Sequence, residues 1–414
     1  MGQSSVLSSV LSSVLSSVLS SVRSVDHSAN HSWNHSVKLS KTKPVVAHLI
    51  QDYLRHTTNW IYGQIVANHE FEHLVLAKRV LNLDQFKVKK IVALQTLPRL
   101  TRFWNEIIYR LFGHQPAFVR ACQREKVALI HAHFGHIGFK AIGLKQKLGV
   151  PLVTTFYGYD VSALGRIPSY RRRFEKLFQK GDLFLAEGPC LSAALVALGC
   201  PQEKIRVFHL GVHVDQYEFR ARPDHKQIRI LFAATLTEKK GWSFAVKAFA
   251  RAAKLNPDIR LRLIGEGEDE AALTQLIEKL GIGPRVERSG YVKHDQLIEE
   301  MLRADVFLQP SQTAKNGNTE GGAPVTLIDA QATGLAICAT FHADIPEVSP
   351  HNVSALLSPE NEIEFLSENL IRLCADHALR TRLGTAGRKR VERDYNWKIQ
   401  GEREAQLYVS LLAQ

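Results

Sequence analysis

Short apolar runs alternate with helix-length segments along most of this chain, in two successive series. The first series includes the apolar runs 45–50, 127–134, 150–158, 182–188 and 205–212. The second begins at 228–235, continues through 259–267, and extends toward the C-terminus. Apolar runs of about five residues that are separated by helices are typical of buried parallel strands. The pattern predicts an α/β protein with two Rossmann-like domains facing across a cleft, joined near residues 213–227.

Composition limits the classes to which the chain can belong. Its 414 residues suffice for two or three domains, and 45% apolar with 22% charged residues is typical of a soluble globular protein. Five scattered cysteines without metal or redox spacing predict buried thiols in a reducing, cytoplasmic compartment. No apolar run reaches the length that a membrane-spanning helix needs. The net charge of +13 indicates an anionic partner: nucleic acid, a membrane surface or an acidic substrate.

Residues 1–43 differ in composition from the rest of the chain. A Ser-Ser-Val-Leu repeat covers residues 6–22, and a stretch rich in His, Ser and Asn follows it. Such serine density cannot bury enough apolar surface to offset the entropy of ordering, so we expect a low-complexity disordered tail. It also lacks the basic start and dense apolar core of a signal peptide. We assign the tail no function.

An acidic, glycine-containing stretch at 319–334 carries the strongest chemical signal. Glu320 precedes Gly321 and Gly322, and Pro324 opens an apolar run that contains Asp329 and stops at Gly334. Proline in the first turn and glycine after the end predict a helix over 324–333, followed by a strand. The amides of Gly321, Gly322 and Ala323 would then offer a seat for phosphate or sugar oxygens. The alternative is a glycine turn that caps an ordinary helix with solvated acids.

This stretch resembles the donor-site signature of retaining glycosyltransferases of family 4, which have the two-domain GT-B fold. Exopolysaccharide and colanic-acid members read roughly E-G-x-P-V-x-L-x-E-A-x-A-x-G. The resemblance implies that Glu320 contacts the donor sugar and that Asp329 holds the ribose hydroxyls. The sequence departs from the signature in having Asp as its second acid and one extra residue between Glu320 and Pro324.

The resemblance extends to other parts of the second series. Residues 235–242 are similar to a family loop in which an arginine and a lysine neutralise the donor diphosphate. Lys240 matches the lysine, whereas Thr235 occupies the place of the arginine, so either Lys239 or a basic residue of the other domain would have to supply the missing charge. Gly265 belongs to a Gly-x-Gly loop, and Tyr291 with Val292 matches a site where backbone groups contact the base. These residues complete the predicted donor site.

Histidines and aromatic residues mark the first series. His131 and His133 share one face of a predicted strand, but the sequence pattern indicates no third ligand beside them, so no metal site is predicted. By resemblance, His133 matches a histidine that lies near the donor sugar; the alternative is a structural histidine at a strand end. Residues 155–160 are similar to the family's T-F-H-G-x-D, with Tyr157 replacing the histidine. Tyr157 and Asp160 are therefore expected on the acceptor or sugar side.

The implied reaction moves a sugar, with retention, from a nucleotide diphosphate sugar to a hydroxyl of a glycan or lipid-linked acceptor. Lys240, Glu320 and His133 are the predicted catalytic residues, and neither a metal nor another cofactor is expected. The implied domains are an acceptor-side domain at 44–212, a nucleotide-sugar-binding domain at 213–395, and a crossover helix at 396–414. The alternative is a non-catalytic nucleotide-sugar-binding relative. Nucleic-acid binding is disfavoured because no recognition module is visible.

Two basic segments predict a peripheral location on the cytoplasmic face of a membrane. Residues 99–126 contain six basic residues against two acids, and residues 166–180 contain six against one. In the first segment, positions 100, 103, 104, 107, 108 and 111 form one apolar helical face. That face could dock on anionic lipid, where each basic residue near the surface adds about 1 kcal/mol. The alternative is that the face packs on the sheet.

Overall fold

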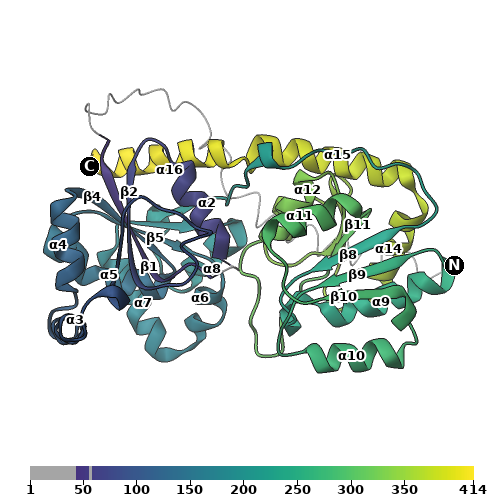
Figure 1. Cartoon of the computed structure of the whole chain (residues 1–414), viewed down its shortest axis with the longest axis horizontal. Helices are drawn as coiled ribbons and strands as arrows, with labels where there is room; N and C mark the ends of the chain where they lie inside the picture. The colour runs from purple at the N-terminus through teal and green to yellow at the C-terminus, as the bar shows by residue number, and fades with distance from the viewer. Residues whose placement is uncertain (1–42, 56–57) are drawn as a thin grey trace. The chain divides into compact units, whose positions relative to one another are not determined.

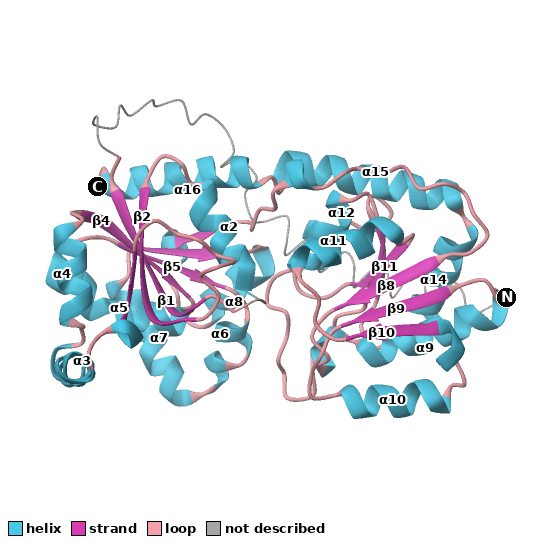
Figure 2. Ribbon diagram, viewed as in Figure 1, coloured by secondary structure: helices cyan, strands magenta, loops and turns pink. Residues whose placement is uncertain are grey.

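The computed structural model describes residues 43–55 and 58–414 (Figures 1 and 2). Residues 43–414 form one compact unit. The predicted tail lies outside the described residues, apart from its last position. Two parallel sheets, shown in magenta in Figure 2, organise this unit as the apolar runs predict.

The first sheet has seven strands in the order β3-β2-β1-β4-β5-β6-β7, and every neighbouring pair is parallel. Its strands are β1 (Val45–Tyr53), β2 (Glu72–Val80), β3 (Ile91–Ala93), β4 (Val127–His133), β5 (Leu152–Phe156), β6 (Leu183–Ala186) and β7 (Ile205–Val207). The accompanying helices are α2 (Asn59–Ala67), α3 (Arg99–Phe112), α4 (Pro116–Arg124), α5 (Gly135–Leu148), α6 (Tyr159–Ser162), α7 (Pro168–Lys180) and α8 (Pro189–Ala197).

The second sheet has six parallel strands in the order β10-β9-β8-β11-β12-β13. They are β8 (Arg229–Ala233), β9 (Arg260–Ile264), β10 (Val286–Ser289), β11 (Val306–Gln309), β12 (Ala336–Thr340) and β13 (Ala355–Ser358). The helices are α9 (Trp242–Leu255), α10 (Glu270–Lys279), α11 (His294–Arg303), α12 (Val325–Ala332), α13 (Ile345–Val348), α14 (Ile363–Ala375), α15 (His377–Asp394) and α16 (Trp397–Leu412).

Short 3₁₀ turns connect several of these elements. They are η3 (Leu94–Thr96), η4 (Leu164–Arg166), η5 (Gln202–Lys204), η6 (Val214–Gln216), η7 (Glu238–Lys240) and η8 (Gly283–Arg285). Two of them matter for the site, because η6 and η7 each carry or precede residues that approach the cavity described below.

The buried strands explain why both sheets are covered on two faces. Along β8, Ile230 and Phe232 pack into one apolar cluster, whereas Leu231 and Ala233 pack into another. Successive side chains of a strand point to opposite faces, so a continuous apolar run needs helices on both sides. The two-layered burial confirms the predicted α/β architecture.

The signature stretch folds as its sequence indicates. Pro324 caps α12, Thr333 ends it, and Gly334 adopts a left-handed φ of +81° before β12 begins. Glycine tolerates this conformation because it has no Cβ. The predicted helix over 324–333 is confirmed.

The last helix packs on the first sheet, although the helix before it covers the second (Figure 1). Ala405 and Tyr408 of α16 are buried with Val46, Leu129 and Leu185. At Gly401, a Cβ would come within 2.2 Å of the carbonyl oxygen of Ala67 in α2, so the two helices touch closely. The domain boundaries at 212 and 395 stay predictions.

Cysteine burial agrees with expectation at all positions but one. Cys122, Cys200, Cys338 and Cys374 are buried and free, but Cys190 is exposed, so the prediction of buried thiols is wrong there. Cys190 lies in the first turn of α8. Within the described ranges, every helix is too short or too polar to cross a bilayer.

Candidate active site

A cavity of about 890 Å³ lies at the carboxyl ends of the strands. Parallel α/β sheets commonly bind ligands at this edge. The first half contributes Trp60, Phe134, Tyr157 and Glu187 to the wall, and the second half contributes Thr235, Lys239, Lys240, Gly265, Tyr291, Val292, Ala323, Glu320 and Asp329. The cavity therefore gathers most of the predicted donor-site residues.

Glu320 is the centre of a buried polar cluster in this wall. Its carboxylate accepts hydrogen bonds from Lys240 Nζ at 2.8 Å and from Ser311 Oγ at 2.8 Å. Lys239 Nζ lies 3.6 Å from the same carboxylate. Burial raises the pKa of Glu320, but the two ammonium groups outweigh burial and hold the pKa below its usual range. Glu320 is therefore an anion that the lysines already neutralise.

The backbone around Glu320 is also held in place. Its amide donates to His342 Nε2 at 3.1 Å, and His342 Nδ1 lies 2.7 Å from a carboxylate oxygen of Glu360. This relay fixes the residue that precedes the two glycines, so the extra residue before Pro324 is accommodated in an ordered loop.

Asp329 lies one turn into α12 and is paired with groups from other elements. It accepts a hydrogen bond from the Tyr217 hydroxyl at 2.6 Å, and His294 Nε2 lies 3.5 Å from its second oxygen. Burial lowers the pKa of His294, but the Asp329 carboxylate outweighs burial and raises the pKa above its usual value. Tyr217 and His294 together fix the position of the Asp329 side chain at the cavity wall.

Gly321 and Gly322 allow neighbouring residues to pack closely against their backbone. A Cβ on Gly321 would lie 2.0 Å from the Cα of Gly158, and one on Gly322 would lie 2.3 Å from Oε2 of Glu187. The Gly321 amide donates to Thr319 Oγ1 at 3.1 Å. Unlike the prediction, neither glycine lines the cavity as the described residues form it. Ala323, Val325 and Thr326 do, so the open wall begins at the helix itself.

The loops after β8 and β9 shape the opposite wall. Gly265 has a φ of +143°, and a Cβ there would lie 1.9 Å from the carbonyl oxygen of Ala234. Only glycine permits this approach of the two loops. Glu266 accepts a hydrogen bond from the Tyr291 amide at 2.9 Å, which fixes the turn that carries Tyr291 and Val292.

Asp160 has a positioning role in the first half. Its carboxylate accepts hydrogen bonds from the amides of Gly135 at 2.7 Å and Tyr157 at 3.2 Å. Burial raises the pKa of Asp160 to about 6. It lies behind the cavity wall formed by the described residues, whereas Tyr157 lines it. Asp160 thus orients the turn that presents Tyr157, instead of facing the cavity as predicted.

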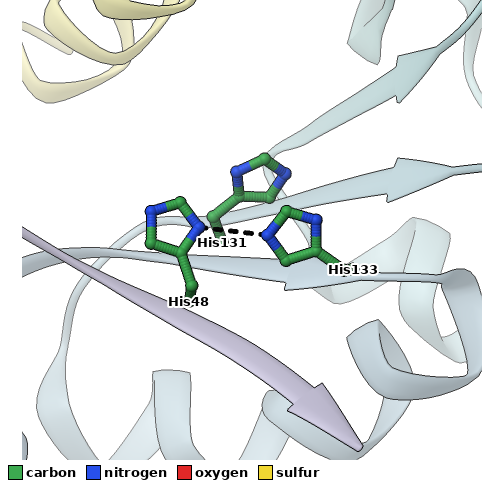
Figure 3. Close-up of side chains that lie close together, drawn as sticks. All are labelled: His48, His131 and His133. Carbon is green, nitrogen blue, oxygen red and sulfur yellow. Dashed lines mark hydrogen bonds between the residues drawn. The ribbon is translucent and has the colours of Figure 1, made fainter. Parts of the chain in front are cut away.

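His133 is buried beside two other histidines (Figure 3). His48 on β1 is the third histidine that the sequence did not place, and it joins His131 and His133 of the neighbouring strand β4. Nδ1 of His48 lies 3.0 Å from Nε2 of His133. Because both β4 histidines point to the same buried face, His133 lies outside the cavity wall formed by the described residues. The position predicted for it beside the donor is therefore corrected.

The hydrogen bonds of this histidine cluster run in one direction. Nε2 of His73 lies 2.7 Å from the Asn68 carbonyl oxygen, which can only accept, so His73 donates there. Neutral His73 then accepts at Nδ1 from His48 at 2.9 Å, and His48 accepts in turn from His133. Burial lowers the pKa of His48 and His133, which keeps these rings neutral.

The chain of donors ends at the cavity wall. His133 is left with Nδ1 as an acceptor 2.6 Å from the Tyr157 hydroxyl, and the side-chain amide oxygen of Gln64 also lies 3.0 Å from that hydroxyl, so His133 and Gln64 compete for its one proton. Each ring nitrogen of His48, His131 and His133 has a hydrogen-bond partner. A cation at this cluster would have to displace the bond between His48 and His133.

Comparison with known proteins identifies the family. Residues 214–390 match the family model "Glycosyl transferases group 1", and residues 63–216 match "Glycosyltransferase Family 4". The amylovoran biosynthesis glycosyltransferase AmsK of Erwinia amylovora is 33% identical over 288 residues, which cover 69% of this chain and 70% of AmsK. The chain belongs to glycosyltransferase family 4. This glycosyltransferase is also 34% identical to the putative colanic acid biosynthesis glycosyltransferase WcaL of Escherichia coli, over 68% of the chain and 70% of WcaL.

Solved structures agree on the fold. Sucrose-phosphate synthase from Thermosynechococcus elongatus has a TM-score of 0.71 at 19% identity, covering 90% of this chain and 100% of that chain. Anabaena HepE, solved in complex with UDP and glucose, has a TM-score of 0.71 at 15% identity, covering 89% and 100%. The glycosyltransferase therefore has the GT-B fold, and the family relationship makes it a hexosyltransferase.

Four residues that line or support the site of this glycosyltransferase were not predicted from the sequence. They are Glu187, Tyr217, Ser311 and His342. Tyr217 lies 112 positions before Asp329, and Ser311 carries no local pattern. Only Glu187 had a usable signal, because a lone acid at the carboxyl end of a buried apolar run marks the binding edge of a parallel sheet.

Proposed function

We propose that this glycosyltransferase transfers a hexose, with retention, from a nucleoside diphosphate sugar to a hydroxyl acceptor during assembly of a cell-surface polysaccharide. The observation that carries the proposal is the pairing of Lys240 with Glu320 in the cavity wall, beside the start of α12. The names of AmsK and WcaL, and the UDP and glucose bound to HepE, support the donor and pathway class.

Each residue has a distinct task in the proposed reaction. Lys240 and Lys239, with the first turn of α12, bind the donor diphosphate, and the Thr235 hydroxyl adds a neutral contact. Asp329 binds the ribose hydroxyls, and Glu320 binds the sugar. The acceptor oxygen forms a bond to the anomeric carbon on the face from which the diphosphate leaves. The bond from the anomeric carbon to the diphosphate oxygen breaks, its electrons stay on that oxygen, and the same oxygen takes the proton of the acceptor hydroxyl. Charge on the leaving diphosphate is what the lysines stabilise.

In the free protein, the lysines proposed to bind phosphate are already paired with Glu320. Lys240 is bound to Glu320, so an arriving diphosphate competes with that carboxylate for the ammonium group. We expect neither a metal nor a cofactor to be required, since lysines and a helix N-terminus supply the positive charge.

A thermal-shift screen against nucleoside diphosphates and their sugars tests the donor. A ligand that binds only the native state raises the melting temperature by mass action. We expect a shift with the diphosphates of one base and a larger or equal shift with its sugar conjugate. If every diphosphate leaves the melting temperature unchanged at millimolar concentration, the donor assignment is wrong.

We further propose that the acceptor is carried on a membrane lipid and that α3 docks on the anionic cytoplasmic face. The predicted apolar face of α3 does not pack on the sheet: Leu100, Phe103, Trp104 and Leu111 are exposed, Leu100 by 69% and Leu111 by 70%. The residue that α3 buries is Asn105, whose side chain accepts from the Ala117 amide. An amphipathic helix with an uncovered apolar face suits a membrane interface.

Positive charge lies near α3, on the side of the helix away from this face. Arg171, Arg172 and Arg173 of α7 are exposed, and Arg173 is close enough to Tyr109, one turn after the buried Asn105, to affect the pKa of Tyr109, which burial raises first. Arginines next to an apolar helix favour an anionic lipid surface over a neutral one. This arrangement supports the membrane over a second protein as the partner of α3.

A further inference from the structure

Glu187 follows β6 at the cavity wall, and its carboxyl lacks a partner. Its backbone carbonyl accepts a hydrogen bond from His209 Nδ1 at 2.7 Å. Its side chain, by contrast, makes no hydrogen bond or ion pair with any other residue of the described ranges 43–55 and 58–414. Glu187 is half-buried and lines the cavity, so its carboxyl is open to a ligand that enters there.

The carboxyl faces the start of α12. Its Oε2 atom lies 2.3 Å from where a Cβ on Gly322 would be, so the Glu187 carboxyl occupies the space beside the Gly322 backbone. Ala323, the next residue, lines the same cavity. Glu187, in the first half of the chain, therefore lies against the N-terminus of α12, which the second half contributes to the proposed diphosphate site.

The charges around Glu187 are mostly negative. Burial comes first in raising its pKa well above the usual value, followed by the carboxylates of Asp344, Asp160 and Glu320, while Lys240 opposes the shift. Lys239 and Tyr157 also interact electrostatically with Glu187. Glu320, by contrast, has a lowered pKa because it holds the lysines. The pKa values of two carboxyls in one cavity are therefore shifted in opposite directions.

Resting on the nucleotide-sugar donor proposed above, we propose that Glu187 is a donor-binding residue that acts as a neutral carboxylic acid, giving its O–H hydrogen bond to an oxygen of the diphosphate. An ionised Glu187 would repel the diphosphate and has no hydrogen to donate. The proton stays on Glu187 throughout, so the residue forms a hydrogen bond and exchanges no group with the donor.

The protonation requirement predicts the sign of the pH dependence. Below the raised pKa of Glu187 the acid is neutral and donor affinity is at its maximum. As pH rises above that pKa, each unit lowers affinity by about tenfold, because binding must first return a proton to Glu187. In that range, binding takes up a proton from the buffer.

Calorimetric titration with UDP, GDP and ADP between pH 7 and 9 tests the idea, with the best-binding diphosphate used throughout. The terminal phosphate of the probe titrates near pH 6, so its charge is constant over this range. Wild-type affinity should fall with rising pH, whereas Glu187→Gln, whose neutral amide still donates, should keep its affinity. Glu187→Ala should bind about tenfold or more weakly than Glu187→Gln at pH 7.

Two further measurements separate the explanations. Glu203→Gln removes the same charge from an exposed site on η5 and should follow the wild-type pH profile. Titration of the wild type in two buffers of different ionisation enthalpy should reveal proton uptake above the pKa, which needs no variant. Melting temperatures of the Glu187 variants check that each one folds.

The outcomes are distinguishable. Parallel pH profiles for wild type and Glu187→Gln would overturn the role of Glu187 while leaving the donor site intact. Affinity that rises with pH, or uniformly weak binding by Glu187→Gln, would show a carboxylate acceptor instead and also overturn it. Failure of the wild type to bind any of the three diphosphates, whatever the pH, would remove the proposed donor and this inference with it.

Discussion

Lys240 and Glu320 neutralise one another in the free protein, and this pairing governs what substitution at either residue should do. Lys240→Ala should weaken nucleoside diphosphate binding, because a hydrogen bond to a charged group contributes about 1.5–3 kcal/mol. Isothermal titration with the free diphosphate measures the loss. Lys254→Ala, which removes an equal charge from the exposed face of α9, is the matched control. Unchanged affinity in Lys240→Ala would remove this lysine from the site.

Glu320→Gln should separate catalysis from diphosphate binding. The amide keeps the shape of the side chain but loses the charge proposed to act on the sugar, so turnover should fall about a hundredfold. Diphosphate affinity should hold or rise slightly, because Lys240 is released from its 2.8 Å contact. Steady-state transfer assays and diphosphate titration measure the two effects. Native turnover in this variant would contradict the sugar role of Glu320.

The proposed membrane docking explains why the apolar face of α3 is exposed. Co-sedimentation with vesicles should require anionic lipid and weaken as salt is raised. Replacing Arg171, Arg172 and Arg173 with Glu should abolish binding, and Phe103→Glu with Trp104→Glu should reduce it even at low salt. Equal binding to neutral vesicles, or absence of binding to both kinds, would reject docking through α3.

The contact between α16 and α2 is a second element-scale feature with a measurable consequence. Gly401→Val should destabilise the protein by about 1–3 kcal/mol, because its Cβ would lie 2.2 Å from the Ala67 carbonyl oxygen. Gly63→Ala on α2 is the matched control, since a Cβ there meets nothing within 4 Å and improves helix propensity by up to about 1 kcal/mol. Thermal unfolding compares them. Equal melting temperatures would show that the helices separate at little cost.

The molecule as a whole should fold and act without its N-terminal segment. Residues 43–414 form a compact unit, with their cores in the two sheets. Removing residues 1–42 should therefore leave the melting temperature and sugar transfer nearly unchanged. Loss of folded protein on truncation would show that the segment contributes to the unit.

The sequence alone determined the location of elements that follow a repeated local pattern. Buried parallel strands need continuous apolar runs, so both strand series can be located from the order of residues alone. The signature at 319–334 also determined the bounds of α12 and the presence of Glu320 and Asp329 at the binding edge, because proline and glycine mark helix ends locally.

The tertiary structure decided what depends on contacts between distant residues. His133 is buried next to His48, 85 positions earlier on the adjacent strand, whose Nδ1 lies 3.0 Å from Nε2 of His133. Tyr217 reached Asp329 across 112 positions, and Glu187 came to occupy the space beside Gly322. Side-chain periodicity states which face of a strand a residue occupies, but the neighbours on that face come from strand order and loop approach, which no local pattern encodes.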